Sequence, residues 1–304
     1  MVTRLQKDIR GSISEDRRQF FAVYNARSRS RRDIKSKGSL ATTSPLSRLR
    51  VSLLNKMLSL SLVALALSVV VKADSWGAAY SLGPTSSAIV EASTTFTPGT
   101  PPTNPKDALF LWIGISNSTS GLIQAGVDQL ADNNAYCGAS STQWCATASY
   151  FGVVNGATTQ LNGDLTPLDG DQSIKIHYKA RPFRLLTSLA DDNLTWDQTV
   201  TLDGKVISTL QSYDGPLLNG GFGTGTECQS DCTGSTSVQK YTNTTIVLQS
   251  ADPKFSSTLG KGTGVVASDM VTADGGKTWT IASIQIPAMF NENPKASGGN
   301  EEFI

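Results

Sequence analysis

The chain has 304 residues, with 26 Lys and Arg against 25 Asp and Glu, one histidine and four cysteines. The net charge of +1 hides an uneven distribution, because residues 1–56 hold 14 basic and 4 acidic residues whereas 11 basic residues face 21 acidic ones from Asp74 onward. An acidic product of this kind is expected to be soluble and not to bind nucleic acid. With one histidine, and with cysteines that oxidation would remove as ligands, we expect neither a metal nor another cofactor.

The segment 57–73 (MLSLSLVALALSVVVKA) predicts the compartment. Its apolar stretch is shorter than the roughly 20 residues of a membrane-spanning helix, and it ends in Val71-Lys72-Ala73, which is typical of a secretory cleavage site. We therefore interpret 57–73 as a signal peptide and the product as secreted and extracellular, without a stable membrane anchor. The basic flank leaves an uncleaved signal anchor as the alternative. Residues 1–56 are predicted to be a disordered basic extension, and Met57 is an alternative start of translation.

Sequons and cysteines agree with secretion. Three acceptor sequences for N-glycosylation begin at Asn117, Asn193 and Asn243. All four cysteines follow the predicted cleavage site, and an even number in an oxidising compartment predicts two disulfides. Their spacing favours Cys137–Cys145 and Cys228–Cys232, although four cysteines allow three pairings.

The residue pattern predicts β-strands almost throughout. In residues 173–179 Ile174, Ile176 and Tyr178 alternate with Lys175, His177 and Lys179. Asp203-Gly204 lies between two strand-like runs and predicts a hairpin. Further strands are expected at 109–115, 194–201, 206–210, 244–248, 264–267 and 279–286, with a turn at 274–276.

Many short strands separated by Gly, Asn and Asp turns indicate an all-β fold, an antiparallel β-sandwich. We place one such domain at 107–290, which is long enough for a sizeable core. Residues 74–106, rich in Thr, Ser and Pro, are predicted to form an arm, and 291–304 a polar tail. Nothing in the sequence fixes the oligomeric state, and we expect a monomer.

Several motifs resemble one family in the correct order. Leu111-Trp-Ile-Gly-Ile115 followed by Gly121-Leu-Ile-Gln-Ala-Gly-Val127 is similar to a signature of the glutamic peptidases, or eqolisins. Segments 168–176, 196–208 and 242–249 resemble later strands of that family. The resemblance implies a concanavalin A-like jelly roll, as in lectins and glucanases, and secreted, acid-active endopeptidase activity.

The resemblance also implies a catalytic pair, in which a glutamate moves protons and a glutamine amide stabilises the oxyanion. Gln124 matches the glutamine, whereas Gln249 occupies the position that we assign to the glutamate. A carboxamide cannot exchange a proton at working pH, so we expect an impaired peptidase. Glu227 and Asp252 are the nearby carboxylates that could replace the lost acid, although the strand parity of Asp252 is unfavourable.

The alternative function is a lectin-like module that binds a carbohydrate or a peptide in the same groove. Trp112, Trp144 and Tyr136 are the candidate groove-lining aromatic residues, with Trp144 the best candidate for an exposed one, while most tryptophans are expected in the core. A serine protease triad would need His177, which lies between two lysines on a polar face. Paired carboxylates on one strand, as in a retaining glucanase, are not evident.

Overall fold

The structure is a computed structural model, and it describes residues 75–102, 106–116, 121–182, 194–213 and 220–291. The predicted extension, signal peptide and polar tail, and the sequons at Asn117 and Asn193, lie outside these ranges. Within these ranges nearly all regular structure is β, as predicted, with one short helix, α3 (Asn133–Cys137), and one 3-10 turn, η1 (Phe255–Thr258). No helix within the described ranges is long and apolar enough to cross a membrane.

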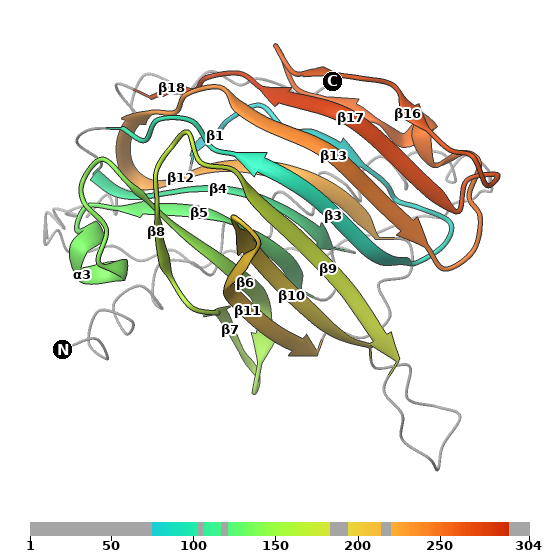
Figure 1. Cartoon of the computed structure of the whole chain (residues 1–304), viewed down its shortest axis with the longest axis horizontal. Coiled ribbons are helices and arrows are strands. Elements are labelled where there is room, and N and C mark those ends of the chain that lie inside the picture. The colour runs from blue at the N-terminus through green and yellow to red at the C-terminus, as the bar shows by residue number, and fades with distance from the viewer. Residues whose placement is uncertain (1–74, 103–105, 117–120, 183–193, 214–219, 292–304) are drawn as a thin grey trace, which may run out of the picture.

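Two antiparallel sheets stack face to face (Figure 1). The first, which we call the β4 sheet, has the order β14 (Gly260–Lys261), β2 (Tyr80–Leu82), β12 (Gly221–Ser235), β4 (Lys106–Ser116), β5 (Leu122–Leu130), β6 (Trp144–Val154) and β7 (Ala157–Asn162). Three short strands extend it: β1 (Ser75–Trp76) and β18 (Phe290–Asn291) pair with β12, and β8 (Thr166–Leu168) pairs with β6.

The second sheet, the β9 sheet, has the order β11 (Lys205–Tyr213), β10 (Leu194–Leu202), β9 (Ile174–Pro182), β3 (Ile89–Thr97), β13 (Gln239–Leu248), β17 (Thr278–Ile286) and β15 (Val266–Ala267). In addition, β16 (Met270–Val271) pairs with β17. The prediction of an all-β antiparallel sandwich is therefore confirmed.

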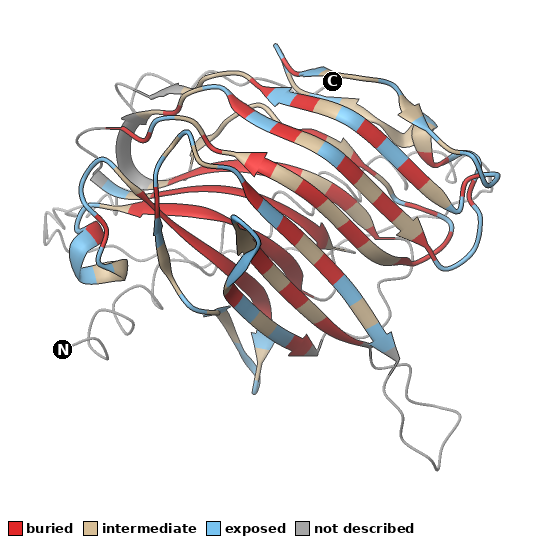
Figure 2. Ribbon diagram, in the orientation of Figure 1, coloured by how far each residue is buried: buried red, intermediate tan, exposed pale blue. Residues whose placement is uncertain are grey.

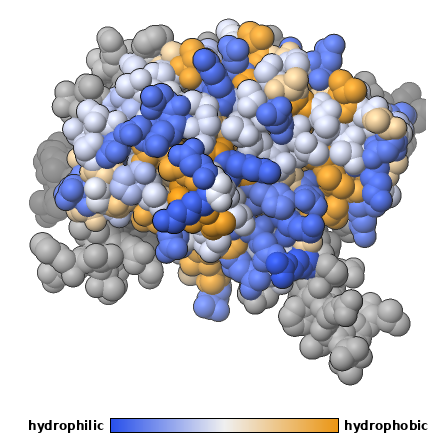
Figure 3. All heavy atoms as spheres, viewed as in Figure 1, coloured by the Kyte–Doolittle hydropathy of each residue, from blue (hydrophilic) through white to orange (hydrophobic). Residues whose placement is uncertain are grey.

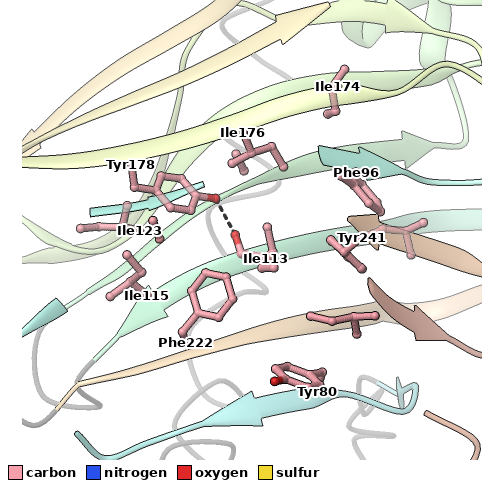
Figure 4. Close-up of a cluster of buried hydrophobic side chains, with 14 of the residues drawn as sticks. Tyr80, Phe96, Ile113, Ile115, Ile123, Ile174, Ile176, Tyr178, Phe222 and Tyr241 are labelled. Atoms are coloured by element: carbon pink, nitrogen blue, oxygen red, sulfur yellow. Dashed lines mark hydrogen bonds between the residues drawn. The ribbon is translucent and has the colours of Figure 1, made fainter. Parts of the chain in front are cut away.

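The two sheets enclose one large apolar core between them. Along β9 the burial alternates as the sequence predicts, with Ile174, Ile176 and Tyr178 facing inward (Figure 2). In this core the Tyr178 hydroxyl donates a 2.6 Å hydrogen bond to the carbonyl of Ile113 on β4, and thus joins the two sheets (Figure 4). Burial of the Tyr178 hydroxyl raises its pKa well above the usual value, so the group stays a neutral donor.

The predicted turns and one disulfide are also found. Asp203 and Gly204, with φ of 49° and 78°, connect β10 to β11 in the left-handed conformation that a tight hairpin needs. Cys137 and Cys145 form the predicted disulfide, which joins α3 to β6. Cys228 is disulfide-bonded as well, and none of the described cysteines is free. The side chain of its predicted partner, Cys232, lies outside the described residues.

The prediction that residues 74–106 form an arm is wrong. This segment contributes β1, β2 and β3, and β3 lies in the middle of the β9 sheet between β9 and β13. Ala92, Thr94 and Phe96 face the core. The error arose because the composition of the segment is that of a linker, whereas its two-residue alternation and its β-branched threonines are those of a strand.

Core packing predicts a large difference between two substitutions. Ile176→Ala should lower the free energy of unfolding by about 2–5 kcal/mol, because it removes three methyl or methylene groups from a closed core. Val206→Ala, at a side chain 52% exposed on β11, should change it by less than about 0.5 kcal/mol. Urea denaturation of both variants measures the difference, and equal effects would contradict the inward assignment of Ile176.

The placement of β3 predicts where the folded domain begins. A product starting at Ser75 should unfold cooperatively. A product starting at Lys106 should show no cooperative transition, because β9 and β13 would lose the strand that joins them. Thermal unfolding followed by circular dichroism distinguishes the two products. A cooperative transition in the shorter product would show that 74–106 is a dispensable arm after all.

Candidate functional site

The outer face of the β4 sheet, which points away from the β9 sheet, carries the candidate site. Along β4 and β5, Ile113 and Ile123 belong to the main core. The alternate residues Phe110, Trp112 and Leu122 form a separate apolar cluster with Phe151 of β6. Because successive side chains of a strand point to opposite faces, Gln124 shares the outer face with Leu122. Gln124 is nonetheless only 3% exposed.

Gln124 lies beside positions that carry no side chain. Its cross-strand neighbour on β4 is Gly114, and the next on β12 is Gly223. On its other side the neighbours are Ser149 and Asn162. The Gln124 Oε1 atom is buried and accepts no hydrogen bond from the described residues. An unsatisfied buried acceptor typically costs about 1–3 kcal/mol, so Gln124 is a candidate to receive a donor from a ligand.

Trp112 and Glu227 form a second part of this face. The Trp112 ring lies over Gly225, in the space that a side chain at that position would occupy. Its Nε1 atom donates to Glu227 Oε2 at 3.3 Å, and Gln229 Nε2 donates to Glu227 Oε1 at 2.9 Å. Glu227 is fully buried. Two neutral donors therefore orient its carboxylate within the β4 sheet.

A third group surrounds Asp128, four residues beyond Gln124 on the same face of β5. The Tyr136 hydroxyl, on α3, donates to Asp128 Oδ2 at 2.9 Å and accepts from Asn162 Nδ2 at 3.2 Å. Burial and the neighbouring Asp128 carboxylate raise the Tyr136 pKa well above its usual value. The hydroxyl therefore remains a neutral donor, and the Cys137–Cys145 disulfide fixes the helix that carries it.

A buried amide contacts the backbone of Gln124 from the inner side of the β4 sheet. Gln198 on β10 is 1% exposed and points from the β9 sheet toward the β4 sheet. In the amide orientation that satisfies both neighbours, its nitrogen donates to the backbone oxygens of Gln124 (3.0 Å) and Ser149 (2.9 Å). The backbone that presents Gln124 is thus tied to the opposite sheet.

The structure does not bring Gln124 and Gln249 together. Gln249 follows β13 in the other sheet, is exposed, and its backbone N–H donates to the carbonyl of Ala88 at 2.8 Å. Glu227 shares the sheet and face of Gln124 but not its cross-strand row, because it pairs with Phe110, which pairs with Asp128. Four residues along a strand span roughly 13 Å, beyond hydrogen-bond reach.

Two other candidates have structural roles. Trp144 is fully buried in the main core, and its Nε1 donates to the carbonyl of Gly99 at 2.7 Å, so its assignment to an exposed groove is wrong. Trp144 is the first residue of β6 and points into the core. Its position next to Cys145 in the sequence does not indicate this orientation. Asp252 caps a turn, accepting hydrogen bonds from Ser86 N (2.8 Å), Lys254 N (3.1 Å) and Thr85 Oγ1 (3.2 Å).

The sequence reasoning missed Asp128, Asn162 and Gln229. A signal for two of them was present, since Asp128 and Gln229 lie an even number of residues from Gln124 and Glu227 on predicted strands. Asn162 had no such signal, because it reaches the site only through the pairing of β7 with β6. Within the described ranges no cluster of three His, Cys, Asp or Glu side chains could hold a metal ion.

The chain is similar to 14 chains of solved structures, among them the following two. One is a scytalido-glutamic peptidase with a transition state analog inhibitor, with 14% identity, a TM-score of 0.39, and coverage of 68% of this chain and 97% of that chain. The other is SCP-B, a member of the eqolisin family of peptidases in a complex with the tripeptide Ala-Ile-His, with 14% identity, a TM-score of 0.33, and coverage of 68% and 96%. No family model and no curated protein matches the sequence.

The role of Asp252 predicts a pH dependence of stability. Burial raises the Asp252 pKa, but hydrogen bonds from Ser86, Lys254 and Thr85 outweigh burial and leave it below the usual value. A lowered folded-state pKa stabilises the protein above the unfolded pKa of about 3.9, and the contribution is lost as pH falls through the folded value. Asp252→Asn should therefore destabilise the protein at pH 6 and progressively less below pH 4. Urea denaturation from pH 2 to 7 measures this, and a constant difference would contradict it.

Proposed function

We propose that this chain is a secreted, glycosylated relative of the glutamic peptidases that binds extended peptides at Gln124 and is impaired in proton transfer. The observation that carries the proposal is the cross-strand row of Gln124. The positions facing it on β4 and β12 are Gly114 and Gly223, so no described residue of that row is a carboxylate. The ordered motifs along the chain support the relationship to the family.

A carboxylate is what such a site would need for hydrolysis. General acid–base help is typically worth roughly 10²–10⁴-fold in rate, and an amide cannot supply it. Glu227 is held by Trp112 and Gln229, and it lies four residues along β12 from the Gln124 row. The geometry thus favours binding over catalysis at Gln124.

Peptide binding suits the chemistry of this face. The unsatisfied Oε1 of Gln124 would accept a hydrogen bond from a peptide N–H. Gly223 carries no side chain that would hold a ligand backbone away from the sheet, whereas the space beside Gly114 is filled by Leu122 and Gln124. Leu122 and Phe151 offer apolar contacts beside these glycines. Secretion and glycosylation are supported by the signal-peptide pattern and by the exposure of Asn243 on β13.

A lectin-like function is the second candidate, because amides and a tryptophan share this face. Trp112 is only 6% exposed and lies over Gly225, so its ring offers no open stacking platform. This favours a peptide over a sugar ring as the ligand.

Placing an acid in the cross-strand row of Gln124 tests the impairment. Gly223→Glu should gain cleavage of an unfolded protein substrate at pH 2–5, by at least about 100-fold over the unmodified protein. A Cβ at position 223 would lie 3.0 Å from the backbone oxygen of Tyr80, so β2 must move by a few tenths of an ångström to admit the new side chain. The gain should disappear in Gly223→Glu/Gln124→Ala. Gln249→Glu adds the same charge on the other sheet and should gain nothing.

Three results would overturn this assignment. Cleavage by the unmodified protein that is lost in Glu227→Gln would make Glu227 the working acid. A gain of activity in Gln249→Glu would place the site on the other sheet. If Gly223→Glu folds, as judged by its thermal transition, and remains silent, the alignment of Gln124 with a catalytic glutamine is wrong.

Binding is tested separately with a fluorescent unstructured peptide. Gln124→Ala should weaken binding by about 10-fold, the loss expected for one buried hydrogen bond. Gln249→Ala should leave it unchanged. Binding to a neutral oligosaccharide without binding to the peptide would select the lectin-like function instead.

A further inference from the structure

The outer face of the β9 sheet is unusual because it gathers positive charge on an acidic protein. The four successive outward positions of β9 are Lys175, His177, Lys179 and Arg181. Outward residues alternate along a strand, so these side chains recur about every 6.6–6.8 Å. None of them takes part in the site on the β4 sheet.

The neighbouring strands add little opposing charge. Lys179 Nζ lies 3.4 Å from Glu91 Oε2, His177 Nε2 lies 2.7 Å from Glu91 Oε1, and Arg181 pairs with Asp197. Among the outward residues of β3, β9, β10 and β13 these are the only two carboxylates. They face four permanent cations, which are Lys175, Lys179, Arg181 and Lys240.

This balance is the reverse of that of residues 74–304 as a whole, in which acidic residues outnumber basic ones by 21 to 11. Lys175 and Lys240 have no carboxylate within ion-pairing distance among the described residues. The positive charge is therefore concentrated on one face, and a negative partner would be attracted there and repelled elsewhere.

Hydroxyl groups surround the basic residues. On the strands beside β9, the outward positions include Ser93 and Thr95 of β3 and Thr199 and Thr201 of β10, and each is a direct cross-strand neighbour of His177 or Lys175. The space-filling view of this side shows hydrophilic side chains gathered over β9 (Figure 3). No phenylalanine, tyrosine or tryptophan points outward from β3, β9, β10 or the described part of β13.

We propose that the outer face of β9 is a docking surface for a linear anionic polysaccharide. Carboxylates of the polymer would pair with the lysines and the arginine, and its hydroxyls would exchange hydrogen bonds with the serine and threonine side chains. The lack of outward aromatic rings disfavours single-stranded nucleic acid, which binds by base stacking. No leucine, isoleucine or methionine points outward from the described parts of β3, β9, β10 and β13, which disfavours insertion into a membrane surface there.

The experiment measures affinity for polygalacturonate at pH 6 and low salt, where charge pairing is least screened. Lys175→Gln/Lys179→Gln should weaken binding at least about tenfold. The control, Lys254→Gln/Lys261→Gln, removes the same net charge from exposed positions away from β9 and should stay within about twofold. Raising the salt concentration to 0.5 M should weaken the unmodified protein, and unchanged thermal transitions establish that both variants fold.

Three outcomes would overturn the proposal of a docking surface. The two double variants could weaken binding to polygalacturonate equally, or the unmodified protein could fail to bind it. The unmodified protein could also bind a fully methyl-esterified polymer with equal affinity. Tighter binding to anionic phospholipid vesicles or to single-stranded DNA than to polygalacturonate would assign the face to that partner instead. None of these results bears on Gln124, so the two proposals fail independently.

Discussion

The arrangement of the whole molecule depends on the two-residue alternation along β4, β5 and β6. Ile113, Ile123 and Ala148 point into the space between the sheets, and this fixes Trp112, Gln124 and Ser149 on the opposite face. A shift of register by one residue would exchange every one of these positions. The apolar side chains that stabilise the sandwich thus also decide which polar groups are presented outside it.

Two contacts between the sheets reinforce this register. Tyr178 donates to the carbonyl of Ile113, and Gln198 donates to the carbonyls of Gln124 and Ser149. Both donors come from the β9 sheet, and all three acceptors belong to the β4 sheet. Because a buried polar group that loses its partner costs free energy, these bonds penalise any sliding of one sheet over the other. The backbone around Gln124 is consequently held from the side opposite to its side chain.

The two outer faces differ in character, although each belongs to the same sandwich. The face of the β4 sheet carries buried carboxylates, Glu227 and Asp128, each held by neutral donors. The face of the β9 sheet is exposed, and its cations outnumber its carboxylates. This separation would allow one molecule to bind a peptide on one side and a charged polymer on the other without competition.

The sequence by itself determined the class of fold, the inward residues of β9, the Asp203-Gly204 hairpin and the Cys137–Cys145 disulfide. These features are local, because alternation, turn conformation and short cysteine spacing depend on residues that are close together in the sequence. Only the tertiary structure placed β3 inside a sheet, buried Trp144, separated Gln249 from Gln124 and set Gly223 in the cross-strand row of Gln124. Such placements depend on which distant strands pair and in what register, and strand pairing is decided by contacts between residues far apart in the chain.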